Sequence, residues 1–160
     1  MIQFTKILYK GETLQLVWQK QINGHTNVYS LKTKVEPHPD FMTVLRSMDK
    51  HICIESELPQ GEAEYNRHDV HGATFAWEED EFGSWLMSAS LISDRFMTLA
   101  DENMKIVTPL KPETSDSGGI PLEVETVKVL YRLIEEAEKY MGGKRYDLFA
   151  QVEAVNKEVA

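Results

Sequence analysis

The strongest constraint on the fold is a strand–turn–strand pattern near the N-terminus. Apolar and polar side chains alternate over residues 13–20, interrupted at Val17, and alternate again over residues 29–34. A period of two is typical of half-buried β-strands. Asn23-Gly24 lies between the two segments, and this dipeptide accommodates the positive φ angles of a tight hairpin turn. Together with the β-rich residues 2–9, the pattern predicts three antiparallel strands in a meander.

Two later segments have the period of a helix. Apolar side chains recur at helical spacing over residues 41–52, and Pro39 suits the first helical turn because that position needs no amide donor. A longer helix is predicted from Pro121 to a stop at Gly142-Gly143. Residues 146–155 predict a short C-terminal helix, because their apolar side chains fall on one side.

Strand periodicity returns between the two helices. Residues 70–77 and 84–92 alternate on either side of an acidic turn, and residues 104–108 form a third, shorter strand. The polar residues 58–66 predict an exposed connection. Residues 111–119 are rich in Pro, Ser, Thr, Asp and Gly, and they predict a flexible loop that is either a lid or slack chain.

The resulting order, βββα-βββα, predicts an α+β fold class. We expect an antiparallel sheet with two main helices packed on it and a short C-terminal helix, all in one domain over residues 1–160. A chain of 160 residues can bury enough surface to fold without disulfides or metals. Duplication of a βββα unit would give the same order, but no residues repeat to support it.

Composition restricts the compartment. No apolar run approaches the roughly 18 residues of a transmembrane helix, and the N-terminal residues lack the pattern of a signal peptide. Cys53 is the single cysteine, which excludes an internal disulfide and is typical of a reducing compartment. We therefore expect a cytoplasmic protein without membrane association.

The charge balance restricts the partners. Twenty-six acidic residues against 17 basic ones give a net charge of −9, which repels phosphate backbones and argues against general nucleic-acid binding. Acidic residues concentrate at Glu78, Glu79, Asp80 and Glu81. This run is either a solvated hairpin tip or an acidic surface that docks a basic protein or mimics DNA.

No familiar catalytic signature is present, so we expect no enzyme activity and no cofactor. Cys53 lies between two isoleucines, where a small buried hydrophobe is commoner than a nucleophile activated by histidine. A zinc site would have to combine Cys53 with His51, His68 and His71, and their spacing does not follow that of zinc-ligand pairs. We therefore predict no metal site.

One local cluster has the composition of a ligand site. Arg67, His68 and His71 occur where a loop enters a strand, in a chain with little positive charge, and Trp77 follows as an aromatic surface for a base. A second basic pair after the long helix completes the candidate ligand-binding residues, which are Arg67, His68, His71, Trp77, Lys144 and Arg145. Two alternatives stay open: Arg67 pairs with Asp69 or Glu64 at the surface, and the C-terminal pair complements the helix dipole.

The aromatic residues of the second strand group suggest an oligomer. If Phe75, Trp77 and Trp85 lie on a sheet face that no helix covers, a second subunit must cover them. We therefore expect a homo-oligomer.

Two stretches carry a resemblance to a known group of proteins. Residues 134–149, IEEAEKYMGGKRYDLF, resemble the C-terminal ends of small proteins from tailed bacteriophages. HGATFAWEEDEFGSWLMSASLI, followed by KIVTPLKPE, is similar to their strand–turn–strand arrangement. The resemblance covers about half of the chain. It implies a phage or prophage origin and synthesis in the bacterial cytoplasm, and it implies no activity or site residue.

These observations favour a binding protein. The leading hypothesis is a phage-encoded homo-oligomer that sequesters a negatively charged, nucleotide-like small molecule and so counters host immunity. The alternatives are an acidic inhibitor of a host bacterial protein, an accessory factor of replication or recombination, and an enzyme of an unrecognised type.

Overall fold

A computed structural model describes residues 2–97 and 103–145. These residues form one antiparallel sheet in the order β3-β2-β1-β4-β5-β6, with the short β7 paired to β5. The strands are β1 (Gln3–Lys10), β2 (Thr13–Ile22), β3 (His25–Thr33), β4 (His68–Glu79), β5 (Trp85–Phe96), β6 (Asn103–Val107) and β7 (Lys111–Pro112). The expectation of an antiparallel sheet combined with helices is confirmed at this level.

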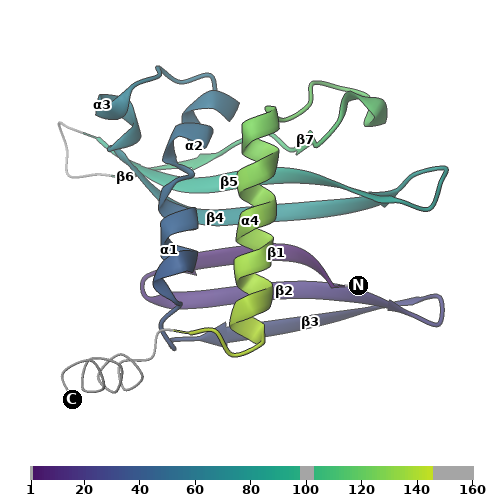
Figure 1. Cartoon of the computed structure of the whole chain (residues 1–160). Helices are drawn as coiled ribbons and strands as arrows, with labels where there is room; N and C mark the ends of the chain where they lie inside the picture. The colour runs from purple at the N-terminus through teal and green to yellow at the C-terminus, as the bar shows by residue number, and fades with distance from the viewer. Residues whose placement is uncertain (1, 98–102, 146–160) are drawn as a thin grey trace, which may run out of the picture.

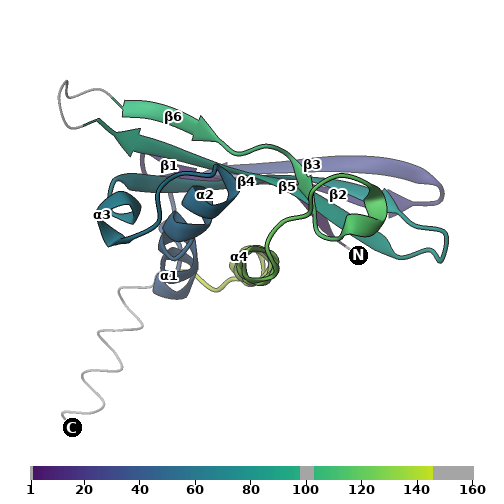
Figure 2. The same ribbon diagram turned by 90° about the horizontal axis from the view of Figure 1, so that it is seen from above.

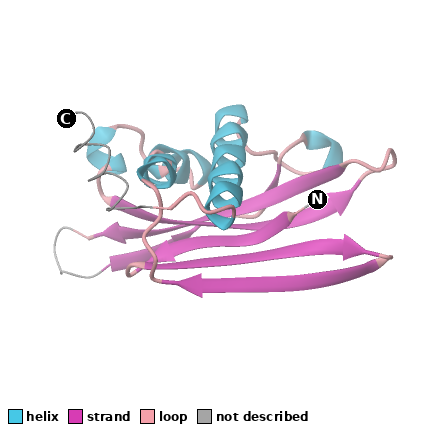
Figure 3. Ribbon diagram, turned by 60° about the horizontal axis from the view of Figure 1, so that its bottom comes forward, coloured by secondary structure: helices cyan, strands magenta, loops and turns pink. Residues whose placement is uncertain are grey.

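The helices lie together on one face of this sheet, as Figures 2 and 3 show. They are α1 (Pro39–Arg46), α2 (Asp49–Glu55), α3 (Glu62–Tyr65) and α4 (Val124–Met141), and a single 3₁₀ turn covers Ser115–Ser117. The long α4 runs across the strands beside α1 (Figure 1). The opposite sheet face has no helix among the described residues. None of the described helices has the length and apolar character of a membrane span.

The single helix predicted over residues 41–52 is two helices in the structure. The break falls at Ser47 and Met48. The Ser47 hydroxyl donates to the Val44 carbonyl (2.6 Å), and the Met48 amide donates to the Leu45 carbonyl, three residues earlier in the chain. Such a tightened turn changes the direction of the axis between α1 and α2. The predicted apolar stripe is nevertheless correct. Val44 is half-buried and packs against the core, and the other members lie in it: Phe41, Leu45, Met48 and Ile52.

Two predicted connections contain structure that the sequence did not indicate. The connection over residues 58–66 includes α3, and its Glu64 is buried. The loop over residues 111–119 includes β7 and a 3₁₀ turn, so part of it is paired to β5. The helix predicted over residues 146–155 lies outside the described residues.

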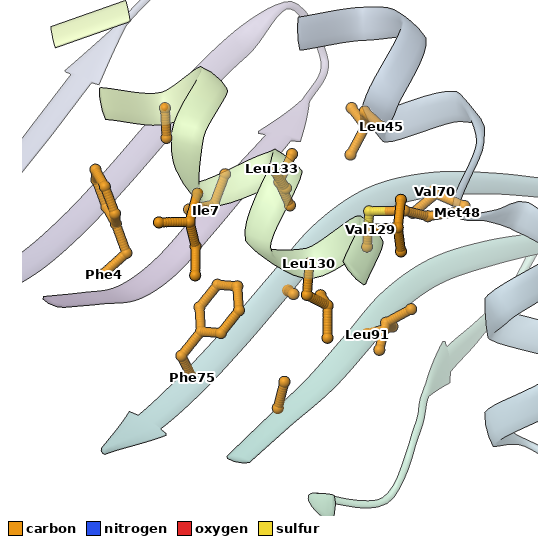
Figure 4. Close-up of a cluster of buried hydrophobic side chains, with 14 of the residues drawn as sticks. Phe4, Ile7, Leu45, Met48, Val70, Phe75, Leu91, Val129, Leu130 and Leu133 are labelled. Atoms are coloured by element: carbon orange, nitrogen blue, oxygen red, sulfur yellow. The ribbon is translucent and has the colours of Figure 1, made fainter. Parts of the chain in front are cut away.

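The core fills the space between the helices and the covered sheet face. Figure 4 shows Leu130 and Leu133 of α4 above Ile7 of β1 and Phe75 of β4, and all four side chains are buried. Trp77 packs against the edge of this cluster, and its indole nitrogen donates to the Phe4 carbonyl (2.7 Å).

The reason given for an oligomer is therefore wrong. Phe75 belongs to the core under the helices, and Trp77 packs against that core. Trp85 lies on the same covered face and is half-buried. The alternation of the strands places other apolar residues on the opposite, open face: Leu8, Val17 and Ile92. All three are half-buried within the single chain.

The contact between β1 and β4 depends on Gly72. His71 is an extra residue in β4, because Val70 pairs with Ser93 while Gly72 pairs with Ile92. This bulge brings Gly72 so close to β1 that an added Cβ would lie 1.9 Å from the Ile7 carbonyl oxygen, and its φ of +149° also disfavours any other residue.

We predict that Gly72→Ala destabilises the fold by about 3 kcal/mol or more, because β1 and β4 must separate to admit the methyl group. The matched control is Gly24→Ala, which has a positive φ of +77° but nothing within 4 Å of the added Cβ. That variant should lose about 1 kcal/mol. Urea unfolding of both variants measures the difference, and equal losses would contradict the close approach of the two strands.

Candidate functional site

A pocket of about 440 Å³ lies where β1 ends and β4 begins. We call it the corner pocket. One wall is the end of β1 and its turn, a second is the latter half of α1, and a third is the segment from α3 into β4. It is lined by Tyr9, Lys10, Gly11, Met42, Leu45, Arg46, Asp49, Tyr65, Asn66, His68, Asp69, Val70 and His71.

Two predicted site residues reach this pocket, but their imidazoles are already engaged. The His68 side chain is fully buried, with Nε2 3.2 Å from Glu64 Oε1 and Nδ1 3.4 Å from Ser93 Oγ. His71 is also buried, and its Nε2 lies 2.9 Å from Asp94 Oδ2. The rings therefore face protein carboxylates, which leaves them little capacity to hold an external anion.

Arg67 and Trp77 do not line the corner pocket. Arg67 Nη1 lies 3.9 Å from Glu64 Oε2, which matches the surface pairing considered as an alternative. Trp77 lies near the C-terminal end of β4, and its indole nitrogen donates to the Phe4 carbonyl.

The C-terminal basic pair is separate from the corner pocket. Lys144 Nζ bonds Asp40 Oδ2 at the start of α1 (2.6 Å) and lowers the pKa of that carboxyl through this hydrogen bond. The Arg145 guanidinium stacks on Tyr140, with 4.6 Å to the ring centroid, and donates to the Tyr140 carbonyl at the end of α4. The six predicted residues therefore do not form one site within the chain.

Sequence reasoning missed the exposed cations of the corner pocket. Lys10 is the last residue of β1 and Arg46 is the last residue of α1, and both side chains are exposed. Tyr9 and Tyr65 belong to the same lining, and both residues are half-buried. No sequence signal joins these four residues, because only the packing of α1 over β1 and β4 brings them together.

A carboxylate network borders the pocket. Arg95 holds both oxygens of Glu64, at 2.7 Å from Nε and 3.2 Å from Nη2. These hydrogen bonds lower the pKa of Glu64 to about 2, although burial opposes the shift. The pKa of Asp94 is also lowered overall. Burial alone would raise it, but the hydrogen bond from His71 and the charge of Lys10 have the larger combined effect.

The four residues considered for zinc are not assembled. His51 lies 2.9 Å from the Thr126 hydroxyl, and burial lowers its pKa. Burial raises the pKa of Cys53 to about 11, so the thiol is protonated at neutral pH and is not an activated nucleophile. Cys53 and His68 do come together, but their third neighbour is Glu64.

The acidic run forms the tip of the hairpin between β4 and β5. Its side chains share a surface depression of about 430 Å³ with Asp116. Phe82 projects from the same tip and is 90% exposed. Asp80 has a structural role, because its Oδ1 accepts hydrogen bonds from the amides of Phe82 and Ser84.

Comparisons of the chain with protein-family models, with curated proteins and with solved structures found no match.

The lowered pKa of Glu64 predicts a pH dependence of stability. A carboxyl whose folded pKa is below its unfolded value stabilises the fold at neutral pH, and this contribution is lost from about pH 5 down to about pH 2. We expect wild-type protein to lose about 3 kcal/mol through this group. Glu64→Gln should lack this pH-dependent contribution, so the free energies of unfolding of the variant and of wild type should converge as the pH falls.

Urea unfolding across this range measures the effect, with the exposed Glu138→Gln on α4 as the control. The control should follow the wild-type profile. Parallel profiles for Glu64→Gln and wild type would show that the Glu64–Arg95 pair does not perturb the carboxyl.

Proposed function

We propose that this protein is a non-enzymatic binding protein that holds a small, negatively charged, nucleotide-like molecule in the corner pocket. The observation that carries the proposal is the convergence of Lys10 and Arg46 with Tyr9 and Tyr65 on one concave surface. The chain as a whole has a net charge of −9, whereas Lys10 and Arg46 balance the charges of Asp49 and Asp69 in the pocket lining, so the pocket is less negative than the rest of the chain.

The lining suits the separate parts of a nucleotide. A guanidinium binds two phosphate oxygens at once, and a lysine ammonium adds a point charge. Tyrosine rings offer flat surfaces against which a base can stack. The carboxylates of Asp49 and Asp69 lie in the same lining and can accept hydrogen bonds from sugar hydroxyls. The volume falls within the range of small-molecule sites.

The biological setting in the proposal comes from the sequence. The resemblance to tailed-phage proteins supports a phage-encoded protein of the host cytoplasm, where sequestration of a nucleotide signal would counter host immunity. A homo-oligomer remains part of the proposal, with the open sheet face as its interface. Leu8, Val17 and Ile92 provide the apolar positions on that face.

We predict that Arg46→Ala weakens binding of the retained nucleotide at least tenfold, because a charge-assisted hydrogen bond contributes about 1.5–3 kcal/mol. Native mass spectrometry of purified protein mixed with a pool of bacterial nucleotides measures the bound mass. Arg132→Ala removes an exposed arginine from α4, away from the pocket lining, and should bind as wild type does. Absence of nucleotide-sized increments on wild-type protein would contradict the proposal for that pool.

A second candidate function is inhibition of a basic host protein through the acidic hairpin tip. The observation that favours it is the fully projecting ring of Phe82 beside Glu78, Glu79 and Glu81. An aromatic anchor surrounded by charges is a common composition of protein interfaces.

This candidate predicts a complex that weakens as salt increases and that is lost when Glu78, Glu79 and Glu81 are replaced by lysine. Asp80 must be retained because it holds the turn. The control reverses three exposed acids of α4: Glu125, Glu135 and Glu138. Affinity capture from bacterial lysate at low and high salt measures the complex. A partner retained equally by both triple variants would exclude the hairpin tip as its docking surface.

A further inference from the structure

Three buried side chains with metal-binding atoms meet at His68, which also lines the corner pocket. Cys53 comes from α2, Glu64 from α3, and His68 from the first position of β4. One thiol sulfur, one carboxylate oxygen and one imidazole nitrogen lie within 4.8 Å of one another. The His68 side chain is fully buried and that of Glu64 is 10% exposed, so these groups are held by packing on three separate elements.

We propose that Cys53, Glu64 and His68 form a binding site for a divalent transition metal of the zinc class. Thiolate, imidazole and carboxylate are the protein ligands that zinc uses. With bonds of about 2.0–2.3 Å, the ligand atoms of a tetrahedral ion are separated by roughly 3.3–3.8 Å. The observed separations of up to 4.8 Å therefore require only small movements of the side chains toward a common centre.

The surroundings of His68 support this assignment. Nε2 faces Glu64, while Nδ1 faces the Ser93 hydroxyl at 3.4 Å, and that hydroxyl lies 3.3 Å from the Asp94 carbonyl. With a metal on Nε2, the ring proton moves to Nδ1 and is donated to Ser93, which in turn donates to the Asp94 carbonyl. A hydrogen-bond acceptor on the distal nitrogen is the usual support of a metal-binding histidine.

Arg95 is compatible with the ion and acts as a positioning residue. Its guanidinium spans both oxygens of Glu64, with the longer bond of 3.2 Å to Oε2. The shorter bond, 2.7 Å, runs from Nε to Oε1, which is also the oxygen that faces His68. Because a carboxylate oxygen has two lone pairs, Oε1 can accept this bond and still bind a metal, while Oε2 stays on Nη2. A thiolate and a carboxylate balance the two charges of the ion, and the Arg95 charge remains partly exposed at the protein surface.

Metal binding must displace the thiol proton of Cys53. Burial raises the pKa of this thiol, the carboxylates of Glu64 and Asp49 add to the shift, and Arg95 opposes it. Each ion bound therefore releases this proton.

Titration of the metal-free 160-residue chain with cobalt(II) tests the proposal. Because Cys53 is the only cysteine, a thiolate-to-cobalt charge-transfer band can arise only from this residue. We expect wild-type protein to develop this band, together with the visible absorption of tetrahedral cobalt, and to lose both on addition of zinc(II). The metal alone is the probe, so the result does not depend on the proposed nucleotide function.

Variants separate the proposed ligands from their neighbours. Cys53→Ser should lose the charge-transfer band, and His68→Gln should bind cobalt at least a hundredfold more weakly. His51→Gln is the matched control, because it replaces a buried histidine two residues from Cys53 that bonds Thr126 instead. It should bind as wild type does, with circular dichroism confirming the fold of each variant. A wild-type protein that develops no charge-transfer band, or a His68→Gln variant that binds as tightly as wild type, would overturn the proposal.

Discussion

The pairing of β1 with β4 is the constraint on which the rest of the structure depends. It joins an N-terminal meander to the strands that follow the first helices, and it consists of three residue pairs between Lys6–Leu8 and Gly72–Thr74. Because β1 lies inside the sheet, α1 and α4 can cover strands from both halves and bury one continuous core (Figure 1). The corner pocket lies at the end of this same junction, so the pairing of β1 with β4 also forms the proposed site.

Buried charges beside the junction are paired rather than free. Glu64 is held by Arg95 and His68, and Asp94 is held by His71 and approached by Lys10. A buried carboxylate without such partners would strongly destabilise the fold. His68 and His71 therefore bond the protein's own carboxylates, and the proposed anion would be bound by the exposed Lys10 and Arg46 of the corner pocket.

Local patterns in the sequence predicted much of the fold and little of the site. Alternating side chains located the hairpins, since each strand carries its own period, and helical spacing located the apolar stripe of α1 and α2. The central place of β1 was not predictable, because its pairing with β4 joins residues separated by about two fifths of the chain. For the same reason, nothing near Lys10 in sequence indicates that Arg46 lies in the same pocket, and nothing near Cys53 indicates Glu64.

Amide-resolved NMR of isotope-labelled protein during titration with the bacterial nucleotide pool tests the central claim most directly. The account predicts that the largest shift changes occur at the walls of the corner pocket, in the turn after β1, the end of α1 and the segment entering β4. Binding that shifts instead the hairpin tip or the end of α4, or a spectrum that does not change, would contradict a nucleotide-like ligand in this pocket.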